Sequence, residues 1–315
     1  MLDVRRLRLL RELARRGTIA AVAEALAFSP SAVSQQLGVL EREAGLPLLE
    51  RTGRRVRLTA AGENLVRHAE AVLERLEQAE ADLARARGGL AGALRIGAFP
   101  TATRAIVPAA LADLARHHPA LEPMVSETDP AAVADALRAG DLDVALVHEY
   151  DFVPALQEPG LATEPLYAEA MYLAAPAGET AEPSEGQPAE GHDQGAALRT
   201  HARAPWITAT PGTLCHAMTV RACQAAGFTP RVRHQVDEFA TVLALVAAGQ
   251  GVALVPQLGV TGPADPAVRL TRLPVRRRTG LAFRSGAGAH PAVAAFGAAL
   301  RAAVPPDLVG SRAET

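Results

Sequence analysis

Residues 29–37 of the chain read SPSAVSQQL, and this stretch decides how the N-terminal part of the sequence folds. Ser29 belongs to the residue types that cap helix N-termini, and Pro30 suits the first helical position, where its missing N–H costs nothing. Val33 and Leu37 then recur at helical spacing and supply an apolar face. The stretch therefore predicts a helix that begins at Pro30 and leaves its serine and glutamine side chains on the surface.

The sequence before this helix predicts two more. VRRLRLLRELARRG, residues 4–17, forms an amphipathic helix that Gly17 ends, and Thr18 can cap the short helix IAAVAEALA that follows. A tight break at FS joins the short helix to the one at Pro30, which is the pattern of a helix-turn-helix. The second helix of such a motif enters the DNA major groove, where glutamine can pair with adenine and serine can contact bases or phosphates. The candidate DNA contacts are Ser29, Pro30, Ser31, Ser34, Gln35 and Gln36.

A basic hairpin is predicted after the helix-turn-helix. GLPLLERTGRRVRLT, residues 45–59, places two short strands on either side of Thr52 and Gly53. Arginine suits phosphate oxygens and guanine edges better than lysine, which this chain lacks altogether. The hairpin would be a wing over the DNA backbone or minor groove. The competing interpretation is that the polar helix and the basic turn are merely solvated surface. The candidate wing contacts are Arg51, Arg54 and Arg55.

Charge and residue pattern together favour DNA binding. The formal net charge is -2, yet residues 1–57 hold eleven arginines against six acidic residues. The run from Leu7 to Gly62 resembles the LysR-type transcriptional regulators, which implies a winged helix-turn-helix that binds promoter DNA. Pro30 stands where glutamine is common in that family, and this difference removes one base contact. The matching residues are Ala23, Glu24, Leu26, Ser29, Ser31, Ala32, Ser34, Leu40, Glu41, Gly45, Pro47, Leu48, Arg51, Arg54, Leu58, Thr59, Ala61 and Gly62.

A long helix is predicted over residues 60–89, because the segment is rich in Ala, Glu, Leu and Arg and ends at two glycines. Its apolar residues keep a heptad spacing, which favours pairing with a second copy of the chain. The alternative is that the helix packs on its own domain. The family resemblance implies a homodimer, and commonly a homotetramer. The stripe consists of Leu65, Ala69, Val72, Leu76, Ala79 and Leu83.

The remainder of the chain, residues 91–308, alternates short apolar runs with helical segments, which predicts an α/β fold with largely parallel sheets. The resemblance implies an effector-binding domain of two Rossmann-like lobes, similar to the periplasmic solute-binding proteins. We expect lobe one at about 91–162 and 269–308 and lobe two at about 163–268, with crossings near 161–166 and 266–270. Residues 177–203 read as a loop because Gly, Pro, Glu and Ser are dense there. The expected domains are thus 1–59 for DNA binding, 60–89 for the linker and 91–308 for the effector.

Two threonine-rich stretches are candidates for an effector site. RIGAFPTATRA and WITATPGTLCHAM each follow a strand and open a helix, the position at which α/β folds bind small anions. The resemblance places further residues around the same pocket. For any single threonine, a helix N-cap is an equally good interpretation. The candidate effector contacts are Thr101, Thr103, Thr128, His148, Thr208, Thr210, Gly212, Thr213, Phe239 and Thr241.

An enzyme is not expected, and no cofactor or metal is implied. Cys215 and Cys223 lack partners for a zinc site and read as reduced thiols, and Cys215 and His216 diverge on a helix. The arginine-rich N-terminus is unlike a signal peptide and no apolar run could span a membrane, so a cytoplasmic location is expected.

The sequence therefore predicts a transcriptional regulator whose partners are promoter DNA, a small acid or amino acid and further copies of itself. RNA polymerase is an additional candidate partner. The alternative is a small-solute receptor without specific DNA readout.

Overall fold

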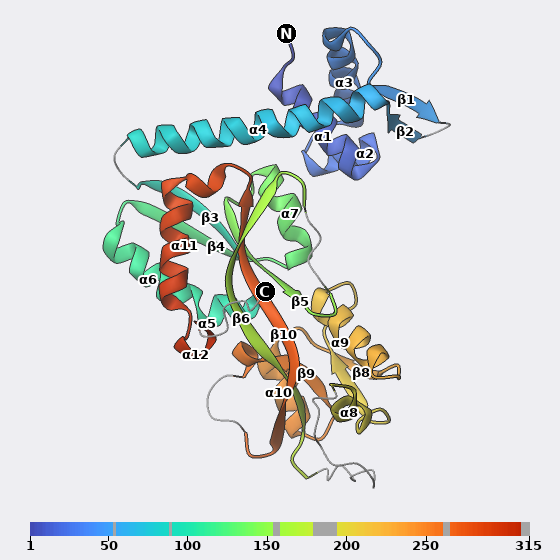
Figure 1. Ribbon diagram of the computed structural model, residues 1–315, viewed down its shortest axis with the longest axis vertical. Helices are drawn as coiled ribbons and strands as arrows, with labels where there is room; N and C mark the ends of the chain where they lie inside the picture. Colours follow the sequence, from blue (N-terminus) through green and yellow to red (C-terminus); the bar gives the residue numbers. More distant parts are fainter. Residues whose placement is uncertain (53–54, 88–89, 154–157, 179–193, 261–264, 310–315) are drawn as a thin grey trace.

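The computed structural model describes residues 1–315 with the exception of 53–54, 88–89, 154–157, 179–193, 261–264 and 310–315. The molecule is elongated, and its parts follow one another along the long axis (Figure 1). A small N-terminal head and the long helix α4 lie at one end, and an α/β body of two lobes extends away from them. Among the described residues, no helix is long and apolar enough to cross a membrane.

The head has the predicted winged helix-turn-helix order. Side chains of Asp3, Thr18 and Ser29 cap its three helices, and Gly17 ends the first helix in the left-handed conformation, with φ 71°. Apolar side chains from all three helices form the head core, with Leu10 fully buried. The elements are α1 (Val4–Arg16), α2 (Ile19–Ala25), α3 (Pro30–Ala44) and the antiparallel pair β1 (Leu49–Thr52) and β2 (Arg55–Leu58).

The linker helix α4 (Ala60–Ala86) begins at the Thr59 cap and leaves the head along its length. Its predicted apolar stripe divides into two parts. Leu65 and Ala69 pack into the head core, so for these two residues the prediction of a dimer contact is wrong and the helix packs on its own domain. The rest of the stripe is exposed, at 39% for Val72, 42% for Leu76 and 59% for Leu83.

The body is built on one six-stranded sheet in the order β4-β3-β5-β10-β6-β9. The prediction of largely parallel sheets is wrong for this sheet. Strand β3 runs parallel to β4 and β5, whereas β10 is antiparallel to both β5 and β6 because one long strand leads into the second lobe and the other returns. The strands are β3 (Gly92–Ala98), β4 (Leu121–Glu127), β5 (Val144–Tyr150), β6 (Leu161–Pro176), β9 (Ala253–Pro256) and β10 (Val268–Arg284).

Helices cover both lobes. Those of the first lobe are α5 (Pro100–Ala105), α6 (Val107–His117), α7 (Pro130–Ala139), α11 (Pro291–Ala303) and α12 (Pro306–Val309). The second lobe adds a parallel pair of strands, β7 (Pro205–Thr208) and β8 (Arg231–Gln235), and the helices α8 (Gln194–Arg199), α9 (Leu214–Ala225) and α10 (Phe239–Ala247). Two short 3-10 helices are η1 (Gln257–Gly259) and η2 (Ala287–Ala289).

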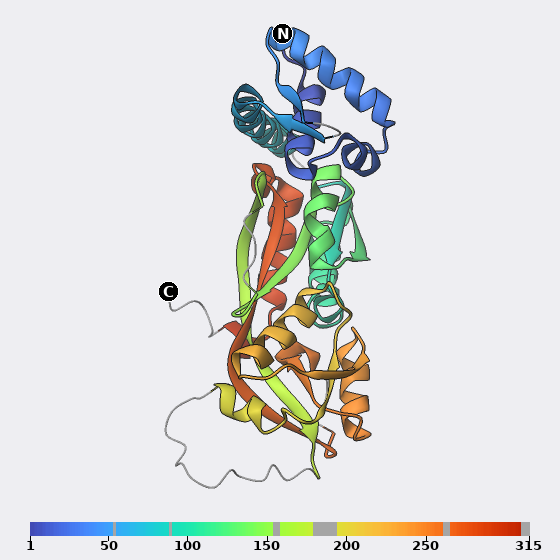
Figure 2. The same cartoon turned by 90° about the vertical axis from the view of Figure 1, so that its right-hand side faces the viewer.

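The two lobes are joined by β6 and β10, which pair from Leu161 and Arg284 at one end to Pro176 and Val268 at the other. Figure 2 shows both strands running through the body. Tyr167 and Leu281 belong to the core of the first lobe, whereas Met171 and Val275 belong to that of the second. We therefore propose that the passages between lobes lie near the middle of these strands, close to Glu169 and Arg277, and not at 161–166 and 266–270. Residues 179–193, most of the loop predicted over 177–203, lie outside the described residues. At Gln194–Arg199 the loop prediction is wrong, because α8 forms there.

Candidate functional site

Helix α3 presents a polar face opposite a tightly packed one. Val33 and Leu37 are 1% exposed, so the helix is fixed in orientation by the head core. Ser31, Ser34 and Gln35 are exposed on the other side. The hydroxyl of Ser29 accepts a hydrogen bond of 3.1 Å from the N–H of Ala32 and thus caps the helix. The packing holds the three exposed polar side chains in the first two turns, where a major-groove helix meets base edges.

Gln36 has a different role from its neighbours. Its Oε1 accepts a 2.9 Å hydrogen bond from Nε of Arg6, and Nη1 of Arg6 pairs with Glu43 at 2.5 Å. These contacts tie α3 to α1. We therefore interpret Gln36 as a residue that orients α3 and not as a free base contact. Helix spacing in the sequence does not distinguish these two roles.

The predicted wing forms a hairpin in which Leu49 pairs with Leu58 and Thr52 with Arg55. Arg54 lies outside the described residues, as do the side chains of Arg51 and Arg55. The hairpin backbone therefore supports a wing, and the contacts of its arginines stay a prediction.

Several head arginines are already paired inside the chain. Glu12 on α1 is 1% exposed and receives Arg11 at 3.0 Å, Arg15 at 3.3 Å and Arg16 at 3.1 Å. Arg16 also pairs with Asp135 of α7 at 2.8 Å. Part of the positive charge of the N-terminus is thus paired within the chain.

A buried ion pair marks the passage between the lobes. Arg277 of β10 and Glu169 of β6 are cross-strand partners, with side chains 1% and 0% exposed and 2.7 Å between Nη2 and Oε1. Burial lowers the pKa of Arg277, but Glu169, followed by Tyr150, Tyr167 and Cys215, raises it, and together these groups hold it above the usual range. Nη2 of Arg277 also donates to Oγ1 of Thr101 at 2.9 Å, and the guanidinium lies 5.0 Å from the ring centre of Phe99.

A second cluster, of buried Tyr150 and His148 with half-buried Cys215, joins α9 of lobe two to β5 of lobe one. Sγ of Cys215 lies 3.0 Å from the hydroxyl of Tyr150 and 4.0 Å from Nε2 of His148. Burial raises the pKa of the Cys215 thiol and of the Tyr150 hydroxyl, and burial followed by Arg277 lowers the pKa of His148 well below its usual value. All three groups are consequently neutral near pH 7. We call these residues with Arg277, Glu169 and Thr101 the lobe junction.

The predicted threonines of the first stretch have partners within the chain. Thr101 is buried and accepts from Arg277, as described above. The hydroxyl of Thr103 donates to the carbonyl of Phe99 at 3.2 Å, and that of Thr128 donates to the carbonyl of Ser126 at 3.2 Å. Thr101 and His148 are thus brought into one cluster, whereas Thr103 and Thr128 stabilise their own turns.

The second stretch forms the turn before α9. Thr210 donates to Oδ2 of Asp237 at 2.7 Å, and Thr213 caps α9 by accepting from the N–H of His216 at 3.2 Å. Gly212 permits this turn with φ +96°, a value that side-chain-bearing residues rarely adopt. For Thr213, then, the N-cap interpretation describes its hydrogen bonds.

The last three candidates lie on β7 and α10 of the second lobe. Thr208 is buried at the end of β7 and donates to the carbonyl of Ala209 at 3.1 Å. Phe239 packs against a core cluster of lobe two, and Thr241 is exposed on α10. Nearby, Arg104 of α5 pairs with Glu238, the N-cap of α10, at 2.6 Å, and so links the two lobes at the surface.

Sequence reasoning missed Arg277, Glu169 and Tyr150. The strand pattern could have indicated Arg277. Residues of β10 alternate between buried and exposed from Leu273 to Thr279, and Arg277 is on the buried side. An arginine at an inward position of an apolar alternation is rarely tolerated without a paired carboxylate.

Two family models match the chain. The model described as "Bacterial regulatory helix-turn-helix protein, lysR family" matches residues 4–63, and the one described as "LysR substrate binding domain" matches residues 87–305. The first covers the head and the second covers almost the whole body.

Relatives and a solved structure agree with these matches. A "Probable hydrogen peroxide-inducible genes activator" of Mycobacterium avium is 32% identical and covers 84% of this chain and 83% of its own. The "HTH-type transcriptional regulator AlsR" of Bacillus subtilis is 30% identical over 75% of this chain and 77% of its own. A mutant OxyR from Corynebacterium glutamicum has a TM-score of 0.53 at 26% identity, covering 96% of this chain and 92% of that one.

Proposed function

Because the chain belongs to the LysR family of DNA-binding transcriptional regulators, with an effector-binding domain behind its DNA-binding head, we propose which of its residues carry the two activities. Ser31, Ser34 and Gln35 of α3 contact DNA bases, and the wing contacts the backbone. The observation that carries this assignment is the exposed polar face of α3, held outward by a buried apolar face. Regulators of this family bind promoter DNA and small molecules and form oligomers.

The DNA-binding proposal is tested by replacing Ser34 and Gln35 with Ala. Specific binding to the promoter fragment should weaken by about 1–3 kcal/mol, because a glutamine–adenine pair discriminates by that amount, while non-specific binding changes little. Fluorescence anisotropy with specific and scrambled DNA measures both. Gln224→Ala, at an exposed glutamine of α9, is the matched control. Equal losses on both DNA fragments would show that these side chains do not read bases.

Arg54→Ala provides the contrasting variant. A wing arginine that contacts phosphate should weaken binding to all DNA sequences and reduce the slope of log affinity against log salt by about 1. An unchanged slope would remove Arg54 from the DNA contacts.

The exposed part of the α4 stripe supports self-association. Val72, Leu76 and Leu83 form an apolar seam beyond the head, and a second copy would cover it as helices do in a coiled coil. Paired copies would present two α3 helices to two half-sites. We propose a homodimer through this seam, and a homotetramer as a further assembly.

The effector site is proposed at the lobe junction, between α5 and the N-terminal turn of α9. Arg277, Thr101 and His148 are gathered there from β10, α5 and β5, and contacts to Cys215 cross from one lobe to the other. Buried Nδ1 of His148 has no hydrogen-bond partner among the described residues. A small acid or amino acid fits these hydroxyl, imidazole and guanidinium donors, and its binding would alter the angle between the lobes.

Thr101→Ala and Thr208→Ala test this site. Both variants should lose the change in promoter binding that a small-acid effector causes, while keeping basal promoter binding, because neither residue is near the head. A thermal-shift screen of small carboxylates and amino acids first identifies the effector as the compound that raises the unfolding midpoint of the unmodified chain. An unaltered effector response in both variants would refute the assignment.

Peroxide sensing, suggested by the printed name of the Mycobacterium avium relative, is not what these thiols support. Reactive cysteines need a lowered thiol pKa, whereas burial raises the pKa of Cys215 and raises that of Cys223 to about 12. Both residues also lie on α9, eight positions apart, which separates their Cα atoms by about 12 Å along the helix. That is too far for a disulfide without unfolding α9.

A further inference from the structure

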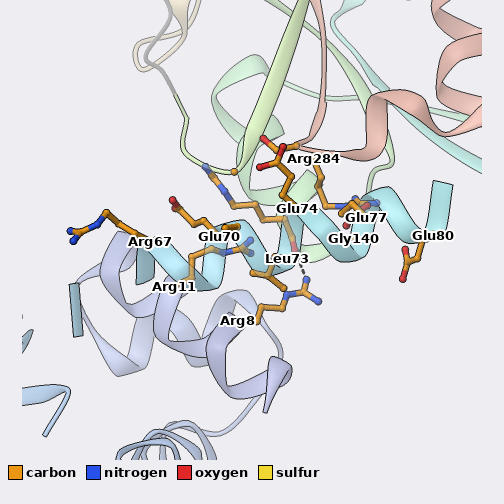
Figure 3. Close-up of a pocket in the computed structure, with 14 residues that line it drawn as sticks. Arg8, Arg11, Arg67, Glu70, Leu73, Glu74, Glu77, Glu80, Gly140 and Arg284 are labelled. Atoms are coloured by element: carbon orange, nitrogen blue, oxygen red, sulfur yellow. Dashed lines mark hydrogen bonds and ion pairs between the residues drawn. The ribbon is translucent and has the colours of Figure 1, made fainter. Parts of the chain in front are cut away.

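A cavity of about 530 Å³ lies where the head, the linker helix and the body meet. Helix α1 contributes Arg8 and Arg11, and α4 contributes Glu70 and Glu74, as Figure 3 shows. The body contributes Arg138 from the end of α7 and Arg284 from the end of β10. We call the contacts of α1 and α4 with α7 and β10 the head junction. This cavity is separate from the lobe junction and does not depend on the function proposed there.

Two of these arginines have buried nitrogen atoms without partners. The Arg138 side chain is 1% exposed and donates from Nη2 to Glu158 at 2.9 Å and to the carbonyl of Pro159 at 2.7 Å. Its Nε and Nη1 have no hydrogen-bond partner among the described residues, and the same is true of Nε of Arg11. Buried donors are normally satisfied, so these nitrogen atoms are open to an acceptor from outside the chain, such as an anion.

Positive charge is also crowded at this place. Burial, and next Arg11, lower the pKa of Arg8, and burial lowers that of Arg138 despite its hydrogen bond to Glu158. Arg284 pairs with Glu77 at 2.5 Å, Arg11 with Glu12 at 3.0 Å and Arg138 with Glu158 at 2.9 Å. Arg11 and Arg138 differ from Arg284 in that they keep buried nitrogen atoms without a hydrogen-bond partner among the described residues. An anion between Arg11 and Arg138, with Arg8 near it, would relieve this crowding.

We propose that the cavity of the head junction binds a small tetrahedral oxyanion, of the phosphate or sulfate type, between Arg11 of the head and Arg138 of the body. The donors come from two separate elements, and a tetrahedral ion offers acceptors in several directions where a planar carboxylate offers only two oxygens. Glu70, Glu74 and Glu80 of α4 line the same cavity and limit the negative charge that it can accept. A phosphate or phosphate monoester is therefore preferred to a diphosphate or tricarboxylate.

Calorimetric titration of the full chain with inorganic phosphate, in chloride buffer of equal ionic strength, tests the proposal. One phosphate should bind per chain, and sulfate should compete, whereas pyrophosphate and citrate should bind more weakly than phosphate. Arg11→Lys and Arg138→Lys keep the charge but lose the directed donors, so each should weaken binding by about tenfold or more. Arg116→Lys, at an arginine of α6 that is 68% exposed, is the matched control and should bind as the unmodified chain does.

Two further measurements keep the outcome interpretable. Arg54→Ala removes an arginine of the wing, which could attract phosphate by itself, and it should leave the titration unchanged. Because Arg138 also holds Glu158 and Pro159, the circular dichroism of each variant is recorded, and Arg11→Lys alone decides the result if Arg138→Lys unfolds. Absence of phosphate binding to the unmodified chain, or full binding by Arg11→Lys, overturns the proposal.

Discussion

The head junction and the lobe junction each join two parts of the molecule, but with different chemistry. At the head junction, Arg15 and Arg16 reach Asp135, whose side chain is 53% exposed, and a cavity lies where the parts meet. At the lobe junction, Arg277 and Glu169 are sealed from solvent on two strands that continue from one lobe into the next.

This difference determines what each junction can do. Exposed ion pairs contribute about 0–1 kcal/mol and weaken with salt, so the pairs of Arg15 and Arg16 with Asp135 add little to the attachment of the head to the body. Removing one partner of a buried pair costs about 3–5 kcal/mol because the other charge is left buried and unpaired, so we expect the pair to stay formed when the angle between the lobes changes. A regulator needs both properties, because an effector must change a well-defined angle and the head must respond to that change.

The largest effect is expected from Glu169→Gln. The substitution leaves the guanidinium of Arg277 buried without its charge partner, and the free energy of unfolding should fall by about 3–5 kcal/mol. Urea denaturation followed by circular dichroism measures the loss. Glu164→Gln, on the same strand but in an exposed pair with Arg301, should cost less than about 1 kcal/mol. Similar losses for the two variants would show that the lobe junction is no stronger than a surface contact.

The pH dependence of stability should come next in size. Because the pKa of His148 lies well below its usual value of 6.5 in the folded chain, the unfolded chain binds an additional proton below about pH 6.5. Above about pH 6.5 neither state binds this proton, so His148 does not lower the free energy of unfolding. Below that pH only the unfolded chain binds it, so the free energy of unfolding falls by at most about 1.4 kcal/mol per pH unit. Thermal unfolding between pH 5 and pH 7.5 measures it.

His148→Phe isolates the contribution of this histidine. The ring packs edge-on against Phe99 at 4.7 Å and Tyr150 at 5.2 Å between ring centres, so phenylalanine can replace its packing without titrating. The variant should lose this share of the pH dependence. His117→Phe, at an exposed histidine of α6, is the control and should keep it. An unaltered pH profile in His148→Phe would mean that His148 does not titrate on unfolding.

The sequence predicted local structure well because local structure depends on neighbouring residues. Caps at Thr18 and Ser29 and the left-handed glycine at position 17 set the helix ends of the head, and all three stand where the sequence predicts them. The path of β6 and β10 was harder to predict. These strands owe their length to each other, through register pairs more than ninety residues apart, such as Leu161 with Arg284.

The candidate sites divide in the same way. The residue types of the α3 face follow from helix spacing, but the contact of Gln36 with Arg6 depends on how α1 packs, which spacing does not reveal. The candidate threonines could be selected from the sequence because each stretch follows a strand and opens a helix. Arg277 and Glu169, in contrast, meet only through pairing between strands. Likewise, Leu65 and Ala69 share the heptad spacing of α4 with Leu76, and only the position of the head shows that they face a core and not a partner.

The smallest effect is expected at the head junction, from Asp135→Asn. Arg15 and Arg16 lose their partner on α7 at 3.4 Å and 2.8 Å, and because Asp135 is exposed the cost should be only about 0.2–1 kcal/mol. Hydrogen exchange of the α7 amides should accelerate by up to about fivefold, since α1 covers them less of the time. Asp113→Asn, which removes a pair within α6, is the control and should leave α7 unchanged.

Salt should reproduce this effect in the unmodified chain. Raising sodium chloride from about 0.05 M to about 0.5 M screens exposed pairs, so exchange in α7 should accelerate in the unmodified chain and much less in Asp135→Asn, where the pair is already absent. Exchange at Ala168 and Ala170, which flank Glu169 of the buried ion pair, should not respond, because a desolvated pair is screened far less than an exposed one. If exchange in α7 is as insensitive to salt as exchange in these strand residues, the two junctions do not differ in their dependence on charge. The head would then be held by packing and not by ion pairs.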